Sequence, residues 1–397
     1  MPAAIRSDKL TSIEEALKIF LDAVIPVARS SPVELDFADN RVLAKDIFAP
    51  KDYPHYDLCF MDGYGVRAED TADSAQSGVL LRLTEGDEVK SGECMLVHTG
   101  SALPAGCDAV VKVEDTQAEP GGIRVFRPAL PGENFTPRGK SIRQGDTVFR
   151  AGMQLKPTNI ALLASLGLAE VEVYERPRVL ILPTGDELVP RGKVAGPGTI
   201  NESNGLMCQM LVKRYGGKPA MWDIVPDNLE KLTEAVTAGL RYDLIVTSGG
   251  TSVGRRDLMP QIVESMGKIL VHGVGLRPGR PVGMGYVEDE TRRTPIVFLP
   301  GFPDACAVCA MVFVEPAIRK LGRYPSAKYP TGSTVMSGTG HVGHRTRSIT
   351  KVLVKDGEAT PVPTVGPTPF AGEYGYILTP DNGGYDAGEP VEVTYFE

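Results

Sequence analysis

The chain has 397 residues, more than one compact hydrophobic core usually serves, so we expect roughly two to four domains. Its net charge of −8 argues against a general nucleic-acid binder or a binder of acidic membranes, and no segment approaches the roughly twenty consecutive apolar residues of a membrane span. Six cysteines without a recognisable secretory signal indicate reduced thiols and a cytoplasmic location.

The N-terminal segment TSIEEALKIFLDAV predicts an amphipathic helix. Thr11 or Ser12 can cap it, and Glu14 or Glu15 is placed to close a capping box. Apolar residues recur on one face, and Pro26 ends the pattern. We therefore expect a helix that docks onto the rest of the protein.

Between about residues 49 and 147 the sequence changes to short apolar runs broken by glycine and proline, which predicts a β-rich module. VLLRL, CMLVHTG, AVVKVED and IRVFRP are its clearest strands. A helical pattern returns at Pro157–Leu168, with proline at its start. The simplest hypothesis is a β module inserted into a helical domain that this helix and the N-terminal one share.

From Arg178 strand and helix patterns alternate, which is typical of a parallel sheet covered by helices on both faces. A last long helix is expected to end near Leu321, and it carries Cys306 and Cys309, which we interpret as core residues. Beyond Pro325 the sequence indicates a separate C-terminal β domain.

The loop TSGGTSVG, residues 247–254, is the clearest candidate binding element. It follows the apolar strand YDLIV and precedes a helical pattern that starts at Asp257. Glycines at such a turn allow a close backbone approach, so backbone N–H groups and hydroxyls can surround a phosphate or oxyanion. The pattern is neither a Walker loop nor a dinucleotide fingerprint. A plain strand–helix turn is the alternative, which the added hydroxyls and carboxylate make the weaker one.

Other polar residues follow neighbouring strands of the same predicted sheet. The carboxyl ends of parallel strands share one edge, where such sheets bind their ligands. We expect a site at this edge that includes Thr184, Asp186, Glu187, Asp227, residues 248–257 and Pro300–Pro303. Asp227 stands at a helix start, so capping alone could explain it.

Six segments in order resemble the MoeA family of molybdopterin molybdenumtransferases, which is related to the E domain of gephyrin: MDGYGVRAED, HTGSALPAGCDAVVKVE, PTGDEL, TSGGTSVGRRD, LRPGRP and LPGFP. The resemblance implies a multidomain α/β plus β protein. Its parts would be a helical domain (1–46 and 147–177), an inserted β-rich domain (47–146), a doubly wound α/β molybdopterin-binding domain (178–327) and a C-terminal β barrel (328–397). It also implies a homodimer with the active site between subunits.

The implied reaction takes adenylylated molybdopterin and molybdate (or tungstate) and releases AMP and molybdenum cofactor with the help of Mg²⁺. A molybdopterin adenylyltransferase would deliver the substrate, and molybdoenzyme assembly factors would receive the product; neither nucleic acid nor membrane is implied. Family positions match the catalytic candidates Asp62, Thr99, Glu187, Asp227 and Asp257. Glu187 and Asp257 are assigned to the metal, because Mg²⁺ prefers oxygen ligands. The candidates for substrate binding are Thr184, Ser248, Gly249, Gly250, Ser252, Gly254, Arg277, Arg280, Pro300 and Pro303.

The chain departs from the family pattern in three places. LRPGRP replaces the usual KPGKP, and Cys59 and Phe60 replace Ser-Ala before MDGY. In the loop usually written LPGNPVSA, Phe302 and Ala305 replace an amide and a hydroxyl, and an acidic Asp304 appears. Asp304 either caps the last helix or places a negative charge in the oxyanion site, where it would weaken molybdate binding.

Two alternatives to the transferase stay open at this point. One is a divergent paralogue that binds molybdopterin or its adenylate as a carrier or assembly partner, which the altered loop favours. The other is a nucleotide enzyme similar to the pyrophosphatase-like proteins named for competence damage. The inserted MDGYGV and HTGSALP segments argue against the latter.

Overall fold

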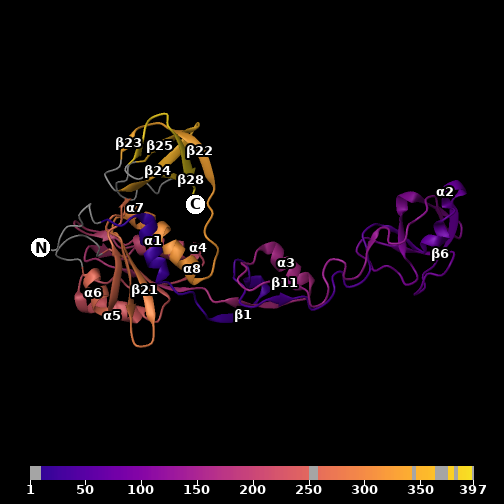
Figure 1. Cartoon of the computed structure of the whole chain (residues 1–397), viewed down its shortest axis with the longest axis horizontal. Coiled ribbons are helices and arrows are strands. Elements are labelled where there is room, and N and C mark those ends of the chain that lie inside the picture. Colours follow the sequence, from indigo (N-terminus) through magenta and orange to yellow (C-terminus); the bar gives the residue numbers. More distant parts are fainter. Residues whose placement is uncertain (1–9, 250–257, 342–345, 363–373, 380–382, 396–397) are drawn as a thin grey trace. The chain divides into compact units, whose positions relative to one another are not determined.

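The computed structural model describes residues 10–249, 258–341, 346–362, 374–379 and 383–395 (Figure 1). The chain forms two compact units. Unit 1 comprises residues 1–31, 40–42 and 174–397, and unit 2 comprises residues 32–39 and 43–173. The predicted α/β and C-terminal β domains both fall in unit 1, and the predicted β-rich module falls in unit 2.

The centre of unit 1 is a six-stranded sheet in the order β16 (Lys218–Met221), β13 (Arg178–Pro183), β17 (Leu244–Ser248), β21 (Arg293–Leu299), β20 (Gly283–Glu288) and β18 (Gly267–His272). The first four strands are parallel, as predicted, whereas β20 and β18 are antiparallel to their neighbours. The reason is the short link between β20 and β21, where Asp289 accepts hydrogen bonds from Thr291 and Arg292. A link this short closes a hairpin and leaves no room for the helical crossover that parallel strands need.

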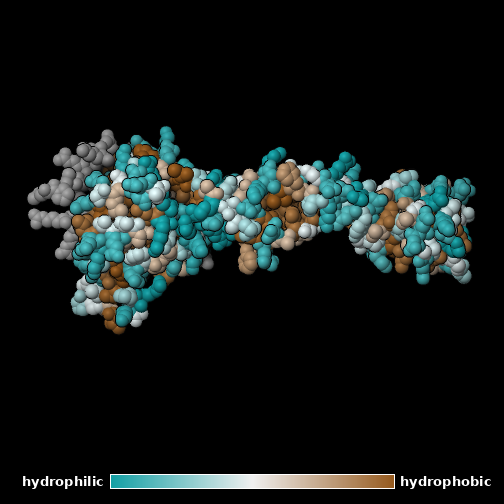
Figure 2. Space-filling model, turned by 90° about the horizontal axis from the view of Figure 1, so that it is seen from below, coloured by the Kyte–Doolittle hydropathy of each residue, from teal (hydrophilic) through white to brown (hydrophobic). Residues whose placement is uncertain are grey.

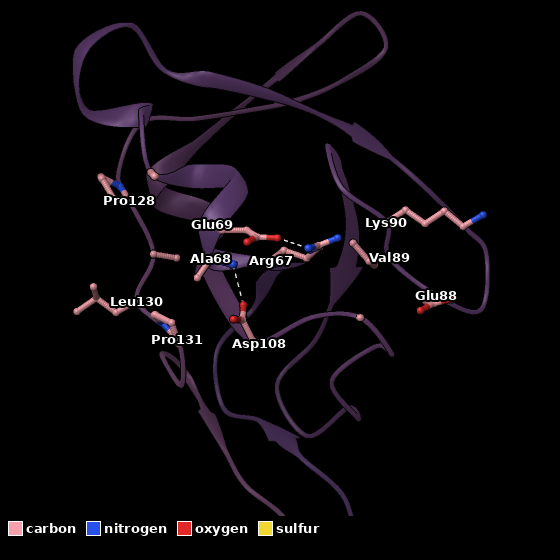
Figure 3. A pocket seen from close by; sticks show the side chains of 13 residues that line it. Arg67, Ala68, Glu69, Glu88, Val89, Lys90, Asp108, Pro128, Leu130 and Pro131 are labelled. Atoms are coloured by element: carbon pink, nitrogen blue, oxygen red, sulfur yellow. Dashed lines mark hydrogen bonds and ion pairs between the residues drawn. The ribbon is translucent and has the colours of Figure 1, made fainter.

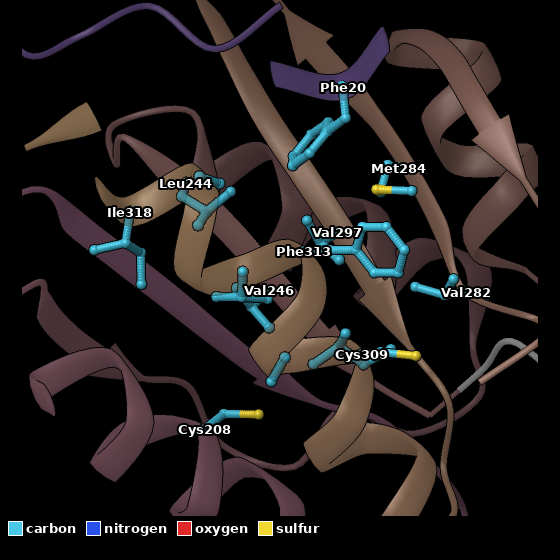
Figure 4. Packing of buried hydrophobic residues seen from close by; sticks show 14 of the residues in the cluster. Phe20, Cys208, Leu244, Val246, Val282, Met284, Val297, Cys309, Phe313 and Ile318 are labelled. Carbon is cyan, nitrogen blue, oxygen red and sulfur yellow. The ribbon is translucent and has the colours of Figure 1, made fainter. Parts of the chain in front are cut away.

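Helices cover both faces of this sheet, which confirms the doubly wound prediction. One face carries α1 (Ile13–Asp22), α4 (Asn204–Arg214), α7 (Pro303–Cys309) and α8 (Glu315–Leu321), and the other carries α5 (Leu229–Gly239) and α6 (Met259–Met266). Figure 4 shows Phe20, Phe313 and Ile318 in one buried cluster with residues of the sheet such as Val246. The predicted last helix is interrupted by a π-helical turn, η5 (Ala310–Val314), between α7 and α8. Cys306 and Cys309 are buried in this core, as expected.

The two helices that were expected to share one helical domain lie in different cores. Phe20 of α1 packs into the core of unit 1. Leu163 of α3 (Pro157–Ser165) packs with Leu43 and Leu155 in unit 2. The sequence pattern predicted both helices, but a helical pattern does not specify the surface that a helix covers.

The C-terminal domain is a closed five-stranded barrel, which confirms the prediction. Its strands pair in the order β24 (Arg347–Lys355), β25 (Glu358–Pro361), β22 (Thr331–Met336), β28 (Pro390–Thr394) and β26 (Gly375–Leu378), and β26 closes the barrel onto β24. The short strand β19 (Leu276–Arg277) of the RPGRP segment pairs in parallel with β24. This pairing ties the barrel directly to a predicted substrate-binding segment.

Unit 2 contains a second six-stranded sheet, in the order β7 (Ala109–Lys112), β4 (Gly63–Val66), β6 (Glu93–Val97), β5 (Val79–Leu83), β9 (Gly122–Val125) and β8 (Thr116–Glu119). The four strands predicted most clearly from the sequence are all present as β5, β6, β7 and β9. Its interior is made by small and branched residues such as Val66, Leu81 and Ile123. The β-rich module is therefore a folded domain with a core of its own.

Short elements complete the described residues: β1 (Ser30–Glu34), η2 (Leu35–Phe37), β2 (Ile47–Phe48), β3 (Leu58–Cys59), η3 (Ala68–Thr71), α2 (Ser74–Ser77), η4 (Val113–Asp115), β10 (Phe135–Thr136), β11 (Thr147–Phe149), β12 (Glu170–Tyr174), β14 (Leu188–Val189), β15 (Ile200–Asn201), β23 (Gly340–His341) and β27 (Gly384–Tyr385). Hydrophobic and hydrophilic side chains are interspersed on the face shown in Figure 2, which is usual for a protein surface in water. Among the described residues, no helix has the length and apolar content needed to span a lipid bilayer.

A buried carboxylate joins the starts of the central strands. Asp243, only 5% exposed, accepts hydrogen bonds from Nη2 of Arg29 at 2.7 Å and from the backbone N–H of Arg178 at 2.8 Å. Nη2 of Arg292 lies 3.4 Å from the other oxygen. Burial by itself would raise the pKa of Asp243, but the hydrogen bonds from Arg29 and Arg178 and their charges outweigh it and lower the pKa. The ionised carboxylate therefore stabilises the fold.

Replacing Asp243 by alanine should lower the free energy of unfolding at pH 7 by about 3 kcal/mol, because the arginines lose a desolvated partner. A pKa that is lower in the folded protein gives stability that is present above about pH 4 and is lost as pH falls through the folded value. The difference between wild type and variant in urea denaturation should thus shrink below pH 4. Glu288→Ala, which breaks an exposed pair with Arg293, is the control and should cost about 0.5 kcal/mol or less. Equal costs for the two variants would contradict this account.

Candidate active site

Three loops begin side by side at the carboxyl edge of the sheet in unit 1. Pro183 pairs in register with Ser248, and Ser248 pairs with Leu299. The residues that follow, Thr184, Gly249 and Pro300, therefore start adjacent loops, as predicted from the strand order. The chain order also reverses between β13 and β17, and this is the position where open α/β sheets bind ligands.

Backbone hydrogen bonds hold these loop starts together. The N–H of Thr184 donates to the carbonyl of Ser248 at 2.9 Å, and the N–H of Gly249 donates to the carbonyl of Leu299 at 3.1 Å. Gly249 has φ +98°, and a Cβ there would lie 2.2 Å from the carbonyl oxygen of Thr184. Only glycine fits at this position. The remaining predicted loop residues, Gly250, Ser252, Gly254 and Asp257, lie outside the described residues.

Three predicted acidic residues follow β13 and precede α5. Asp186 and Glu187 are exposed, and Oδ1 of Asp186 accepts a hydrogen bond from the N–H of Asp227 at 3.0 Å. The helix cap of α5 is Asn228, whose side chain accepts from the N–H of Lys231 at 3.0 Å. Capping therefore does not explain Asp227, and the structure brings it beside Asp186 instead.

The RPGRP and LPGFP segments form one pocket of 460 Å³. Arg277 and Arg280 line it together with the predicted residues Pro300 and Pro303. Its position at the sheet edge and its two guanidinium groups suit an oxyanion or phosphate. The departures from the family pattern in the LPGFP loop line the same pocket: Phe302, Asp304 and Ala305.

The interpretation of Asp304 as a helix cap is wrong. The cap position of α7 is Phe302, and Asp304 lies two residues further along, within the helix. Burial raises the pKa of Asp304, and the positive charge of Lys351 in β24 partly opposes this rise. Lys351 is itself 5% exposed. The arginine pocket thus contains the carboxylate of Asp304, and the buried cation Lys351 acts on that carboxylate. The sequence did not predict a role for Lys351.

Changing Asp304 to valine together with Ala305 to serine should tighten molybdate binding at this pocket. The change removes one negative charge and adds one hydrogen-bond donor, which together are worth about 1–3 kcal/mol. Calorimetric titration of both proteins with molybdate and tungstate measures the difference. The control is Glu234→Gln, which neutralises an exposed carboxylate on α5 outside this pocket and should leave the affinity unchanged. Equal affinities in wild type and double variant would show that the loop does not affect oxyanion binding.

In unit 2 the predicted residues Asp62 and Thr99 lie together on an exposed edge. Oδ1 of Asp62 accepts a hydrogen bond from the N–H of Thr99 at 2.9 Å. The ring of His98 is also close, with its Nδ1 3.5 Å from the same oxygen. His98 was not predicted as a site residue. Its position directly before Thr99 in the sequence could have indicated it.

A cavity of 860 Å³ in unit 2 contains none of the predicted residues. Figure 3 shows two contacts among its lining residues: Arg67 pairs with Glu69, and Asp108 accepts a hydrogen bond from the N–H of Ala68 at 2.7 Å. These contacts hold the η3 turn against the sheet. We therefore assign them a structural role.

The sequence reading also missed Asn204, the first residue of α4. Its Nδ2 donates to the carbonyl of Gly301 at 2.8 Å and so fixes the LPGFP loop. Its Oδ1 is buried and has no hydrogen-bond partner among the described residues. Buried polar atoms are normally paired, so this oxygen is available to a donor that the described residues do not supply.

Comparison with known proteins agrees with this architecture. Residues 11–167 match the family described as MoeA N-terminal region (domain I and II), and residues 180–320 match the "Probable molybdopterin binding domain". A crystal structure of the molybdopterin biosynthesis MoeA protein of Pyrococcus horikoshii superimposes with a TM-score of 0.82 at 29% identity, over 98% of this chain and 100% of that one. These matches define a protein with the MoeA fold and a molybdopterin-binding α/β domain.

Two curated relatives are named molybdopterin molybdenumtransferase. The protein of Nostoc sp. is 36% identical over 73% of this chain and 69% of its own length, and that of Haemophilus influenzae is 32% identical over 81% and 80%. The chain belongs to the molybdopterin molybdenumtransferase (MoeA) family, a family of enzymes of molybdenum cofactor biosynthesis.

Proposed function

We propose that this protein inserts molybdate into adenylylated molybdopterin and releases AMP and molybdenum cofactor. The observation that carries the proposal is the convergence at one sheet edge of the Thr184, Gly249 and Pro300 loops with the arginine pocket. The reaction needs a place for phosphates and a place for an oxyanion. Both lie within unit 1, at neighbouring loops.

The protein's own groups divide the work as follows. The backbone of the Ser248–Gly249 turn offers a close approach to phosphate, and Arg277 and Arg280 supply positive charge that a chain of net charge −8 otherwise lacks. These groups bind and orient the substrate before any bond is broken.

No group of three or more His, Cys, Asp or Glu side chains among the described residues could hold a metal ion, so the proposed cation site combines Glu187 with Asp257, which lies outside those residues. Glu187 is exposed in the loop between β13 and β14, and its oxygens lie close to the backbone of Gly185, where a Cβ would come within 2.7 Å of Oε1. Such hard oxygen donors are what Mg²⁺ prefers. We assign Glu187 and Asp257 as its ligands. When bound, Mg²⁺ would neutralise the charge that develops on the anhydride oxygens.

The second half of the site is proposed to come from another copy of the chain. Asp62 and Thr99 form a hydrogen-bonded pair in unit 2, and both side chains are exposed. In a homodimer they would complete the site of the partner subunit. A cytoplasmic location, substrate supply by a molybdopterin adenylyltransferase and delivery to molybdoenzyme assembly factors belong to the same proposal.

A carrier that binds molybdopterin without inserting metal is the second candidate, and Asp304 in the arginine pocket favours it. Incubating the purified protein with adenylylated molybdopterin and Mg²⁺, with and without molybdate, separates the two. The transferase releases AMP, whereas a carrier binds the adenylate and leaves it intact. Intact adenylate after many equivalents of molybdate and Mg²⁺ would overturn the proposal.

A further inference from the structure

A second cavity opens at the same edge of the sheet, on the side of β16. It has a volume of 530 Å³, within the usual range for small-molecule sites. It is lined on one side by residues after β13, among them Asp186 and Leu188, and on the other by Trp222 and Asp223 after β16. Pro183 and Gly185 also line it, and these two residues flank Thr184 in the chain. The cavity therefore lies next to the loop that starts at Thr184. None of the substrate-binding residues assigned above lines this cavity, so those assignments give it no role.

Trp222 is the only tryptophan of the chain. Its backbone N–H donates a hydrogen bond to the carbonyl of Ile181 at 2.9 Å, which fixes the backbone of Trp222 next to β13. The side chain is partly buried against the core under α5 and α6, and it also lines the cavity. The tryptophan thus packs against the core and also forms part of the cavity wall. Such a surface suits stacking with a flat heteroaromatic ring.

Three carboxylates and one arginine line the cavity together with the tryptophan: Asp186, Glu202, Asp223 and Arg191. Glu202 is 8% exposed, and its Oε1 accepts a hydrogen bond from the N–H of Gly205 at 2.5 Å. Asp223 is exposed and directly follows Trp222. A carboxylate binds two neighbouring N–H donors in parallel. A 2-amino-4-oxo-pyrimidine edge has two such donors side by side, whereas adenine has only one amino group next to a ring acceptor.

We propose that this cavity binds the pterin ring of the substrate, with Trp222 stacking on the ring and Asp223 accepting its adjacent N–H groups. The inference rests on the proposed function, because that function names a pterin as part of the substrate. Pro183 connects the two sites, since it lines the cavity and pairs in register with Ser248 of the phosphate loop. A substrate with a pterin at one end and phosphates further along matches this arrangement.

The single tryptophan makes the test direct. Titrating the protein with 6-hydroxymethylpterin, without Mg²⁺ or molybdate, should quench the fluorescence of Trp222 in a saturable manner, while adenosine should cause no saturable quenching. Asp223→Asn should weaken pterin binding at least about tenfold, because the amide replaces one acceptor by a donor. The control is Glu234→Gln, an exposed acid on α5 outside the cavity, and it should bind as wild type does. Trp222→Phe, followed by calorimetry, should also weaken binding.

Three results would overturn the inference: no saturable quenching by the pterin, equal binding of pterin and adenosine, or unchanged affinity in Asp223→Asn. Because the titration omits metal and molybdate, it is independent of turnover. A protein that releases AMP and cofactor but fails the titration loses only the pterin assignment. A protein that binds the pterin but never forms cofactor loses the proposed function instead.

Discussion

Replacing Glu187 by alanine should abolish Mg²⁺-dependent AMP release from adenylylated molybdopterin and leave the fold unchanged. Glu187 is exposed in the loop between β13 and β14, so its side chain contributes little to the core. As a proposed ligand of the cation, it should matter far more for the reaction than for folding. We expect a loss of at least about 100-fold, the scale of removing a group that stabilises developing charge. Asp257→Ala should behave in the same way.

The measurement is AMP formation at increasing Mg²⁺ concentration, with thermal denaturation of each variant alongside. Glu234→Ala is the matched control, because it removes an exposed acid of the same unit from the middle of α5. It should retain wild-type activity. Full activity in both Glu187→Ala and Asp257→Ala would remove these residues from the mechanism.

Mixing two inactive variants should restore activity if the site lies between subunits. Asp62→Ala disables the unit 2 side, and Glu187→Ala disables the sheet-edge side. A heterodimer of the two has one doubly damaged site and one intact site. After random exchange half of the dimers are heterodimers, so the mixture should recover about one quarter of wild-type activity.

Subunit exchange is confirmed separately, for example with two differently tagged chains that co-purify. The control mixture combines Glu187→Ala with Asp257→Ala, both proposed for the same side, and it should stay inactive. No recovery in the first mixture after confirmed exchange would place Asp62 and Glu187 in the site of a single subunit.

Local sequence patterns predicted the strands and the ends of strands well. The run VLLRL is β5 residue for residue, and the edge formed by Thr184, Gly249 and Pro300 follows from strand order alone. The direction in which each strand runs could not be predicted as well. β20 runs antiparallel to β21 because a short link joins them, and β18 runs antiparallel to β20; an apolar run looks the same in either direction.

The candidate site shows the same division. Polar residues in the loops after β13, β17 and β21 were found, whereas Asn204 at the start of α4 and Trp222 directly after β16 were not. Asn204 acts through a hydrogen bond to a carbonyl 97 residues away, and Lys351 approaches Asp304 from the barrel. Contacts between distant segments leave no periodic pattern in a single sequence. For Asp227, in contrast, the sequence suggested a local role that the structure does not show: the cap of α5 is made by Asn228.

The central claim is that one site couples cleavage of the adenylate to molybdate insertion. The most direct test measures AMP and molybdenum cofactor in the same reaction of purified protein, adenylylated molybdopterin, Mg²⁺ and molybdate. We predict one cofactor for each AMP and loss of both products in Glu187→Ala. AMP release without cofactor, or cofactor formation that survives Glu187→Ala at the wild-type rate, would contradict the account.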